Sequence, residues 1–76
     1  MADVMVRLEH LRSVPGLSGK PGYCSGGARR WFNARGISWR TFVREGIPAS
    51  QLRATGDGLA LRLVEHAEMM EAKRGR

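Results

Sequence analysis

Residues 25–45 read SGGARRWFNARGISWRTFVRE and carry the clearest structural signals of this 76-residue chain. Their large apolar side chains recur at spacings of three and four, which predicts two short amphipathic helices over residues 26–35 and 39–45. Ser25 and Ser38 are suited to cap the two helices, because a serine hydroxyl accepts a hydrogen bond from a backbone N–H of the first turn. A glycine between them ends the first helix. The stretch therefore predicts a tight helical corner.

The segments before the corner predict an extended start, a short helix and a loop. Residues 4–12 carry apolar side chains at both strand and helix spacing, and we expect an extended beginning that continues into a helix over about residues 7–13. A strand here would have no partner within the chain, so we expect it to pair between chains. Residues 14–27 hold five of the ten glycines and two of the three prolines, a composition typical of a loop. Leu17 and Tyr23 are expected to hold this loop against the core.

The segments after the corner predict one more helical turn and one long helix. Pro48 suits the start of a short helical turn within residues 47–54, since proline is tolerated in a first turn. Asp57 is a good cap for the last and longest helix, expected over about residues 58–73, while residues 74–76 should fray. We expect this helix to bury one apolar stripe, made of Leu59, Leu63, Val64, Ala67 and Met70.

These elements together predict a single small all-α domain over residues 1–76. Three to four short helices pack under a longer C-terminal helix, and the N-terminal segment is extended. A chain of this length buries only about 60% of the surface that its unfolded form exposes, so its core is thin. Small domains without a disulfide or a metal commonly rely on a partner or on self-association. We therefore expect a binding protein, with nucleic acid, a protein partner or a second copy of the chain as the partner.

The composition excludes several classes of protein. Hydrophobic residues make up 42% of the chain, too many for a disordered tail. A lone cysteine, Cys24, cannot form an internal disulfide, and together with His10 and His66 it offers too few soft ligands for structural zinc. No apolar run approaches the ~20 residues of a membrane-spanning helix, and the first four residues lack the features of a signal peptide. We expect a soluble protein without membrane contact, metal, cofactor or small-molecule substrate.

Positive charge is concentrated in the middle of the chain. The chain has 13 Lys and Arg against 7 Asp and Glu, a formal net charge of +6. Residues 20–53 hold seven of these bases and one acid, Glu45, so this span carries the whole excess, whereas residues 57–76 are neutral. Arginine outnumbers lysine 11 to 2. Its planar guanidinium suits bidentate contacts with phosphate, although a GC-rich genome produces the same bias.

The arginines of the corner are the first candidate binding site, because a basic face on a helical corner is the minimum footprint of a nucleic-acid-binding protein. The candidate contacts are Arg29, Arg30, Arg35, Arg40 and Arg44. The corner can be laid on a helix-turn-helix with Gly36 in the turn and Phe42 buried. That fit is poor at Phe32, where a small residue is normally wanted, and at Glu45, where a second core residue belongs. Two alternatives stay open: a purely structural corner, and a last helix whose glutamates fold back to neutralise the arginines.

No motif in the sequence indicates catalysis, and we expect a protein that is not an enzyme. Nothing places Cys24 beside His10 or His66, and no pair of carboxylates lies among apolar residues, as general acid–base catalysis requires. We expect a half-buried thiol at Cys24 and a solvated imidazole at His66. The four large aromatic side chains of the corner lie at core spacing, so we expect them to be buried rather than to stack on bases, with Trp39 as the most exposed.

The last helix is the second candidate binding site, in this case for a protein partner. Its apolar band includes two adjacent methionines, whose flexible thioether side chains suit an adaptable contact surface. The candidate residues are Leu59, Leu63, Met69 and Met70. The alternative role of this band is to cover the core of its own domain.

The spacing of glycine, aromatic and arginine residues also resembles that of a known group of proteins. The motifs are Gly22-Tyr23-Cys24, Gly27-Ala28-Arg29, Trp31-Phe32, Gly36, Trp39, Phe42, Gly46-Ile47-Pro48-Ala49 and Thr55-Gly56-Asp57. From about His10 to Val64 they resemble small uncharacterised proteins encoded in bacteriophages and prophages of proteobacteria. The resemblance implies a non-enzymatic accessory protein in the cytoplasm of a bacterial host or associated with a virion. The resemblance assigns no site residues. If the protein binds another protein rather than nucleic acid, we expect a morphogenesis component or an inhibitor of a host protein.

Overall fold

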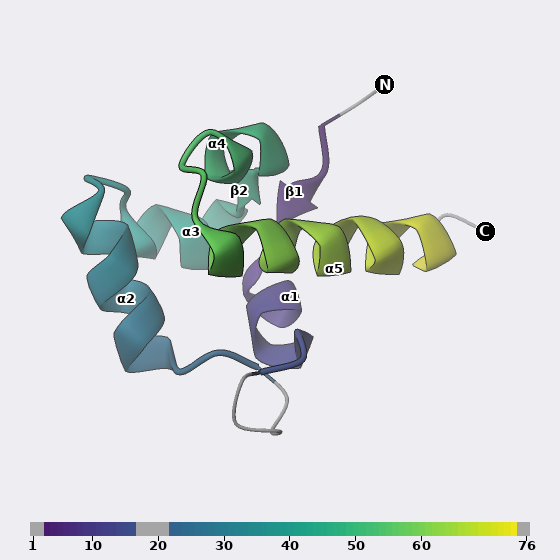
Figure 1. The fold of residues 1–76 in the computed structure, drawn as a ribbon, viewed down its shortest axis with the longest axis horizontal. Coiled ribbons are helices and arrows are strands. Elements are labelled where there is room, and N and C mark those ends of the chain that lie inside the picture. The colour runs from purple at the N-terminus through teal and green to yellow at the C-terminus, as the bar shows by residue number, and fades with distance from the viewer. Residues whose placement is uncertain (1–2, 17–21, 75–76) are drawn as a thin grey trace.

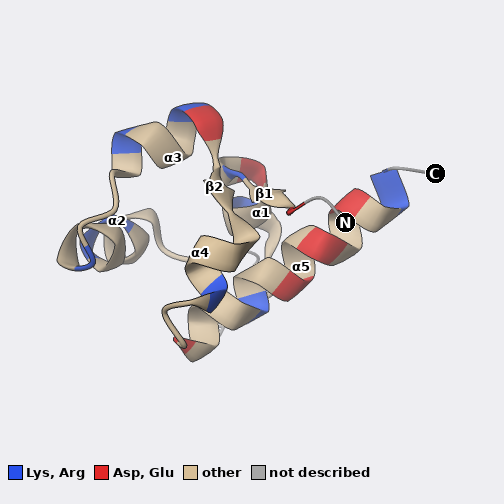
Figure 2. Cartoon of the chain, turned by 90° about the horizontal axis from the view of Figure 1, so that it is seen from above, with Lys and Arg blue, Asp and Glu red and all other residues tan. Residues whose placement is uncertain are grey.

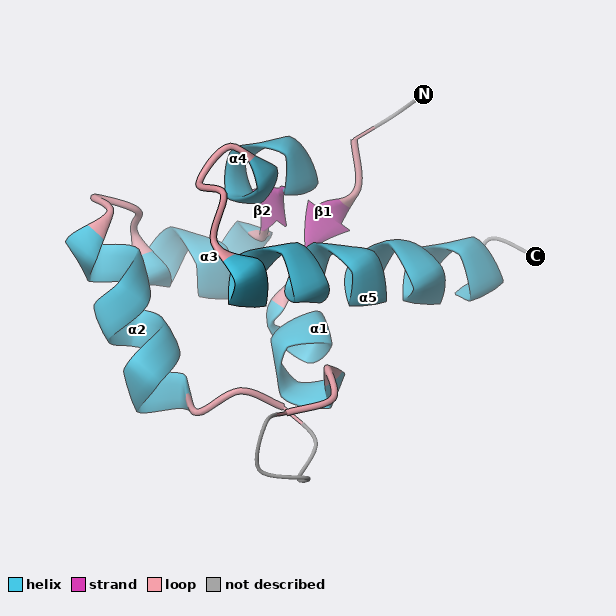
Figure 3. Cartoon of the chain, in the orientation of Figure 1, coloured by secondary structure: helices cyan, strands magenta, loops and turns pink. Residues whose placement is uncertain are grey.

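The computed structural model describes residues 3–16 and 22–74 (Figure 1). In order, the elements of this part of the chain are β1 (Met5–Val6), α1 (Leu8–Ser13), α2 (Ser25–Ala34), α3 (Trp39–Glu45), β2 (Ile47–Pro48), α4 (Ala49–Arg53) and α5 (Gly58–Arg74). The described chain is therefore a mostly helical domain with a long C-terminal helix, as predicted, and it adds one very small sheet (Figure 3).

The sheet is formed within the chain, which corrects the expectation that an N-terminal strand would pair between chains. β1 runs antiparallel to β2, with Met5 opposite Pro48 and Val6 opposite Ile47. The backbone N–H of Ala49 continues this contact by donating to the Val4 carbonyl over 2.8 Å. A strand of two residues is too short to show a period in the sequence, so β2 was included in the predicted helical turn over residues 47–54.

The core lies between α5 and the elements that it crosses, namely α1, α4 and β1 (Figure 1). Its buried apolar residues are Val6, Leu11, Val14, Phe32, Phe42, Ile47, Ala49, Leu52, Ala60, Leu63, Val64 and Ala67. The predicted stripe of α5 is confirmed for Leu63, Val64 and Ala67. It is wrong for Leu59, which is 41% exposed because it lies in the first turn of α5, beside an open cavity rather than under another element.

The corner formed by α2 and α3 is set by local hydrogen bonds. Gly36 has a φ of +70°, its N–H donates to Asn33, and the N–H of the next residue, Ile37, donates to Phe32 over 2.9 Å. These two bonds make a Schellman motif, which satisfies the last carbonyls of α2 and turns the chain toward α3. The predicted cap at Ser38 is confirmed, since its Oγ accepts the Thr41 N–H over 3.1 Å.

The predicted cap at Ser25 is wrong. α2 begins one residue earlier than expected, and Cys24 occupies the capping position with its backbone carbonyl accepting the Ala28 N–H. Two glycines follow Ser25 in the first turn of α2, and no side chain caps the N-terminus of this helix.

The C-terminal helix begins as the sequence predicts and ends later. Asp57 caps α5 by accepting the Ala60 N–H at Oδ2 over 3.0 Å. Arg74, expected to fray, is the last residue of α5 and pairs with Glu9 and Glu71. Of the residues expected to hold the loop, Tyr23 is half-buried and donates its hydroxyl to the Leu59 carbonyl, whereas Leu17 lies outside the described residues.

Candidate functional site

The corner is supported from beneath by an aromatic cluster that joins α2 to α3. The centroid of the Phe32 ring lies 5.4 Å from that of Trp31, 5.4 Å from that of Trp39 and 4.8 Å from that of Phe42. Phe32 and Phe42 are buried, whereas both tryptophans are only half-buried. The core role predicted for these rings is confirmed for the phenylalanines, and Trp31 shares the partial exposure that was expected of Trp39 alone.

Two of the candidate arginines stack on the half-buried tryptophans. The guanidinium of Arg35 lies 4.1 Å from the centroid of the Trp31 ring, one helical turn away in the sequence. The guanidinium of Arg29 lies 5.9 Å from the Trp39 ring and so links α2 to α3. Such cation–π contacts hold a guanidinium by its flat face and leave its N–H edges free to donate. All five candidate arginines are exposed on these elements.

The glutamates of α5 do not fold back on these arginines, which rules out that alternative for the described residues. Glu68 pairs with Arg53, and Glu71 pairs with His10 and Arg74. Within residues 3–16 and 22–74, the ion pairs include one candidate arginine, Arg35, whose Nη2 lies 3.9 Å from Asp57. The remaining four are Arg29, Arg30, Arg40 and Arg44. Figure 2 shows the result: basic residues on α2 and α3, and a row of acidic residues along α5.

In the structure, as in the sequence, the α2–α3 corner fits a helix-turn-helix poorly. Phe42 is buried in α3 as such a motif requires, but Phe32 fills the space between the helices, and Glu45 is exposed. Arg40 and Arg44 lie one turn apart on α3, so they project from the same side of this helix. The geometry therefore supports a basic surface rather than a specific groove-reading motif.

An apolar cavity of about 380 Å³ lies beside the corner, between α2 and the first turns of α5. Residues that line it include Tyr23, Gly27, Ala28, Trp31, Asp57 and Leu59. The space exists because two successive positions of α2, Gly27 and Ala28, carry small or no side chains. The sequence did not predict this cavity, whose one signal there was the run of small residues at the start of the predicted helix.

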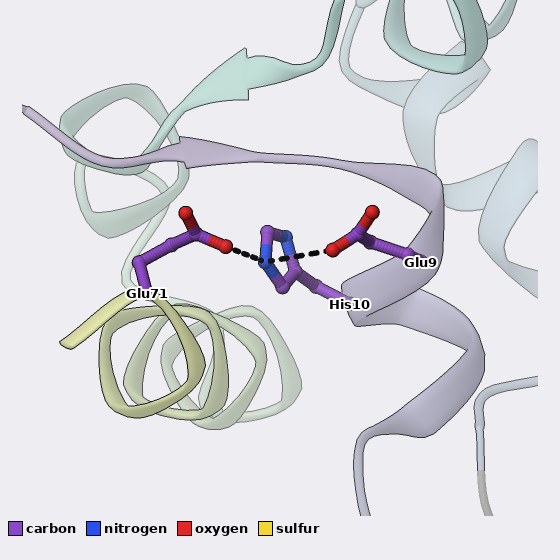
Figure 4. Close-up of side chains that lie close together, drawn as sticks. All are labelled: Glu9, His10 and Glu71. Carbon is purple, nitrogen blue, oxygen red and sulfur yellow. Dashed lines mark hydrogen bonds and ion pairs between the residues drawn. The ribbon is translucent and has the colours of Figure 1, made fainter. Parts of the chain in front are cut away.

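A second cluster joins α1 to the end of α5 and consists of Glu9, His10 and Glu71 (Figure 4). His10 is fully buried. Its Nδ1 accepts the backbone N–H of Arg7 over 2.8 Å, so the hydrogen of the neutral ring lies on Nε2 and is donated to Glu71 over 3.0 Å. The sequence signal for this burial was present, because His10 stands four residues from both Val6 and Val14, which are buried too.

The same hydrogen bonds argue against a metal centre at this cluster. A metal ion on Nε2 would need the lone pair of that nitrogen and would leave a hydrogen on Nδ1. That hydrogen would face the Arg7 N–H, so two donors would meet. Glu9 and Glu71 are also paired with Arg74. The arrangement therefore acts as a structural connection between α1 and α5.

Cys24 and His66 both lie in surroundings different from those expected. Cys24 is exposed rather than half-buried, and the polarity of the backbone N–H groups of Gly27 and then Gly26 lowers the pKa of its thiol. His66 is half-buried rather than solvated, and its Nε2 lies 2.8 Å from Ser13 Oγ. Burial lowers the pKa of His66 below 6.5. Neither histidine lines the cavity beside Cys24, so the described residues form no cysteine–histidine pair there.

The candidate residues of the protein-binding band are not brought together on one surface. Leu63 is 3% exposed and belongs to the core, whereas Leu59 and Met69 are 41% and 49% exposed. Met70 is half-buried, with its Sδ 3.3 Å from Ser13 Oγ. Leu59 lies over the cavity at the start of α5, and Met69 lies ten residues further along.

Comparison with known protein families, with curated proteins and with solved structures finds no match for this chain. Among the helices of residues 3–16 and 22–74, none is both long and apolar enough to cross a membrane. The resemblance to phage proteins thus stays an expectation from the sequence.

Proposed function

We propose that this protein binds nucleic acid through the arginines of the α2–α3 corner. The proposed contacts are Arg29, Arg30, Arg35, Arg40 and Arg44. The observation that carries the proposal is the separation of charge: Glu9, Glu68 and Glu71 of α1 and α5 pair with bases outside the corner, while four of the five arginines form no ion pair with a described carboxylate.

Exposed guanidinium groups without acidic partners are suited to a polyanion. Each phosphate that they neutralise releases counterions from the nucleic acid, which supplies affinity that falls steeply with salt. The stacks of Arg29 and Arg35 on tryptophan rings restrict these side chains before binding, so less conformational entropy is lost when phosphates are contacted. In this proposal the protein is a non-enzymatic accessory protein of a phage or prophage.

The test is a titration of labelled single-stranded and duplex DNA at two salt concentrations, read by fluorescence anisotropy. The informative variant is Arg40→Gln with Arg44→Gln, both exposed on α3. Its matched control is Arg12→Gln with Arg62→Gln, which removes the same charge from exposed arginines of α1 and α5. We expect the α3 variant to bind several-fold more weakly and to lose about 0.9 of salt slope per duplex phosphate contact removed.

The control variant should retain most of the affinity and the wild-type slope. Absence of binding at low salt, or equal losses in both variants, would contradict the proposal.

The competing proposal, a protein–protein module on α5, is supported less well. Its exposed residues Leu59 and Met69 are separated along the helix, and Leu63 between them is committed to the core. Sedimentation analysis distinguishes the two functions, because a self-associating α5 surface would produce a dimer with little salt dependence.

A further inference from the structure

We infer that the cavity beside α2 receives one unpaired base of a single-stranded nucleic acid, while the arginines around it hold the neighbouring phosphates. This inference rests on the proposed function and deepens it, because it commits the arginine-bearing surface to single strands. Two features of the ten-residue helix α2 support the inference. One side of this helix lines an apolar, aromatic recess, and the helix also bears exposed guanidinium groups.

The recess has the size and lining that a base requires. Its volume of about 380 Å³ lies at the small end of the range of roughly 300–1,000 Å³ that small-ligand sites occupy. Trp31 and Tyr23 supply aromatic surface, and Ala28, Leu59 and other aliphatic residues complete the walls. The Tyr23 ring is held in place, because its hydroxyl donates to the Leu59 carbonyl over 3.0 Å. Stacking on such rings is how proteins bind single strands with little sequence preference.

One acidic group stands among these apolar walls. Asp57 lines the recess, and its Oδ2 already accepts the Ala60 N–H at the start of α5. Its Oδ1 is 3.9 Å from the Arg35 guanidinium, beyond hydrogen-bond distance, and so keeps the capacity to accept. A nucleobase matches this lining, since it combines apolar faces with amino and ring N–H donors along its edge.

The charges around the recess suit the phosphates that adjoin such a base. Arg30 lies at the rim, because its Nη1 and the Sγ of Cys24, which lines the recess, are 3.8 Å and 3.9 Å from the same point, a Cβ built on Gly26. Arg35 stacks on Trp31 itself. A base inserted beside Trp31 would therefore bring its backbone to at least two guanidinium groups, which makes the occupant an anionic chain with an aromatic side group. Bases in a duplex are stacked and paired, so only a single strand can enter without the cost of unpairing.

The test compares two leucine substitutions at adjacent glycines of α2. Gly27 lines the recess, and a Cβ there meets only the Cys24 Cβ, at 3.9 Å, so the side chain in Gly27→Leu has room to occupy the recess. Gly26→Leu is the comparison variant: Gly26 is not part of the lining, and a Cβ there lies 3.8 Å from the Arg30 guanidinium, so an effect through this phosphate contact reaches single strands and duplex alike. Both changes raise the helix propensity of α2, and circular dichroism checks that both variants fold.

Binding is measured with a single-stranded DNA, an RNA of the same sequence, the duplex DNA and a single strand whose central nucleotides are abasic. We expect wild-type protein to bind both single strands more tightly than the duplex or the abasic strand, with quenching of tryptophan fluorescence only when bases are present. Gly27→Leu should weaken single-strand binding by roughly 5- to 100-fold, the range of one lost base stack, and leave duplex binding unchanged. Gly26→Leu should keep the wild-type ratio of single-strand to duplex affinity.

The outcomes separate the inference from the function on which it rests. If no polyanion binds at low salt, the proposed function fails and the inference with it. If duplex, abasic and single strands bind the wild type equally well, nucleic-acid binding stands but the recess holds no base. The abasic strand gives this answer with wild-type protein, so the test does not depend on the folding of either variant. A difference between the DNA and RNA arms identifies which sugar the surface accepts.

Discussion

At the scale of the residue, His10 connects two parts of the chain that are 61 positions apart in the sequence. Its two ring nitrogens make different hydrogen bonds: Nδ1 accepts the backbone N–H of Arg7, and Nε2 donates to the Glu71 carboxylate. A fully buried ring whose polar atoms are both satisfied stabilises a small domain, whereas one left without a partner would cost about 1–3 kcal/mol. The hydrogen bond to Glu71 therefore fixes where the C-terminal part of α5 lies on α1.

Substitution of Glu71 distinguishes a neutral His10 donor from an ion pair. Glu71→Gln keeps a side-chain oxygen that accepts from Nε2, and we expect the free energy of unfolding to fall by less than about 1 kcal/mol. Glu71→Leu leaves the buried donor without a partner, with an expected loss of about 1–3 kcal/mol. Both variants lose the charge that pairs with Arg74, so urea unfolding compares them at equal charge. Equal losses in the two variants would show that charge, rather than the acceptor oxygen, is what His10 requires.

At the scale of the element, two glycines with positive φ have different structural roles. Gly36 has a φ of +70° and ends α2, and a Cβ built there meets no atom within 4 Å. Gly46 has a φ of +86° and leads from α3 into β2, and a Cβ there would lie 2.9 Å from the Val6 carbonyl oxygen. Gly46 is therefore required both for its angle and for the close approach of β1 to the chain that follows α3.

Alanine at each of these glycines separates the two requirements. Gly36→Ala introduces the strain of a left-handed L-residue, about 1–2 kcal/mol. Gly46→Ala places an L-residue at positive φ with a ψ of −178°, a region that is essentially restricted to glycine, and adds a clash with the β1 backbone, so we expect it to cost a further 1–3 kcal/mol or so. Thermal unfolding followed by circular dichroism measures the difference. Similar melting temperatures for both variants would mean that β1 and β2 approach each other less closely than the structure shows.

At the scale of the whole molecule, charge and packing are divided between two regions. α5 crosses α1, α4 and β1 and carries two of the paired acids, Glu68 and Glu71, while α2 and α3 lie away from its C-terminal end and carry four of the candidate arginines (Figures 1 and 2). The cavity lies where the first turns of α5 meet α2. The region that stabilises the fold is therefore largely separate from the surface proposed to bind, so binding variants on α3 should leave the fold intact.

The stability of the whole domain should decrease in two steps as the pH falls. Burial lowers the pKa of His66 below 6.5, so below that pH the unfolded chain takes up a proton that the folded chain resists. The hydrogen bond from Arg74 lowers the pKa of Glu9 below 4.5, with the same sign in a more acidic range. Urea unfolding at a series of pH values should show the free energy of unfolding falling below 6.5 and again below 4.5.

Single substitutions show which residue causes each of the two decreases in the free energy of unfolding. His66→Gln retains a polar contact for Ser13 and should flatten the upper step only, while Glu9→Gln should flatten the lower step only. A protein that becomes more stable between pH 7 and pH 5 would contradict the sign for His66.

The features that the sequence predicted correctly are set by neighbours within about four positions. The bounds of α3, its cap at Ser38 and the cap of α5 at Asp57 depend on side chains that hydrogen-bond to the next turn of the backbone. The burial of Phe42 follows from its place on the apolar side of a short helix. Ser25 is the exception, because a suitable residue type does not by itself place the hydroxyl on a first-turn N–H.

The sequence by itself therefore determined the helical class, the corner between α2 and α3 and the excess of positive charge on it, because periodicity, caps and composition act locally or add along the chain. Only the tertiary structure decided that β1 pairs with β2, that His10 meets Glu71, that Leu59 borders a cavity and that the glutamates of α5 pair with bases outside the corner. Each of these depends on which distant segments pack together. That choice comes from the shape and burial of many side chains at once, which no short stretch of sequence contains.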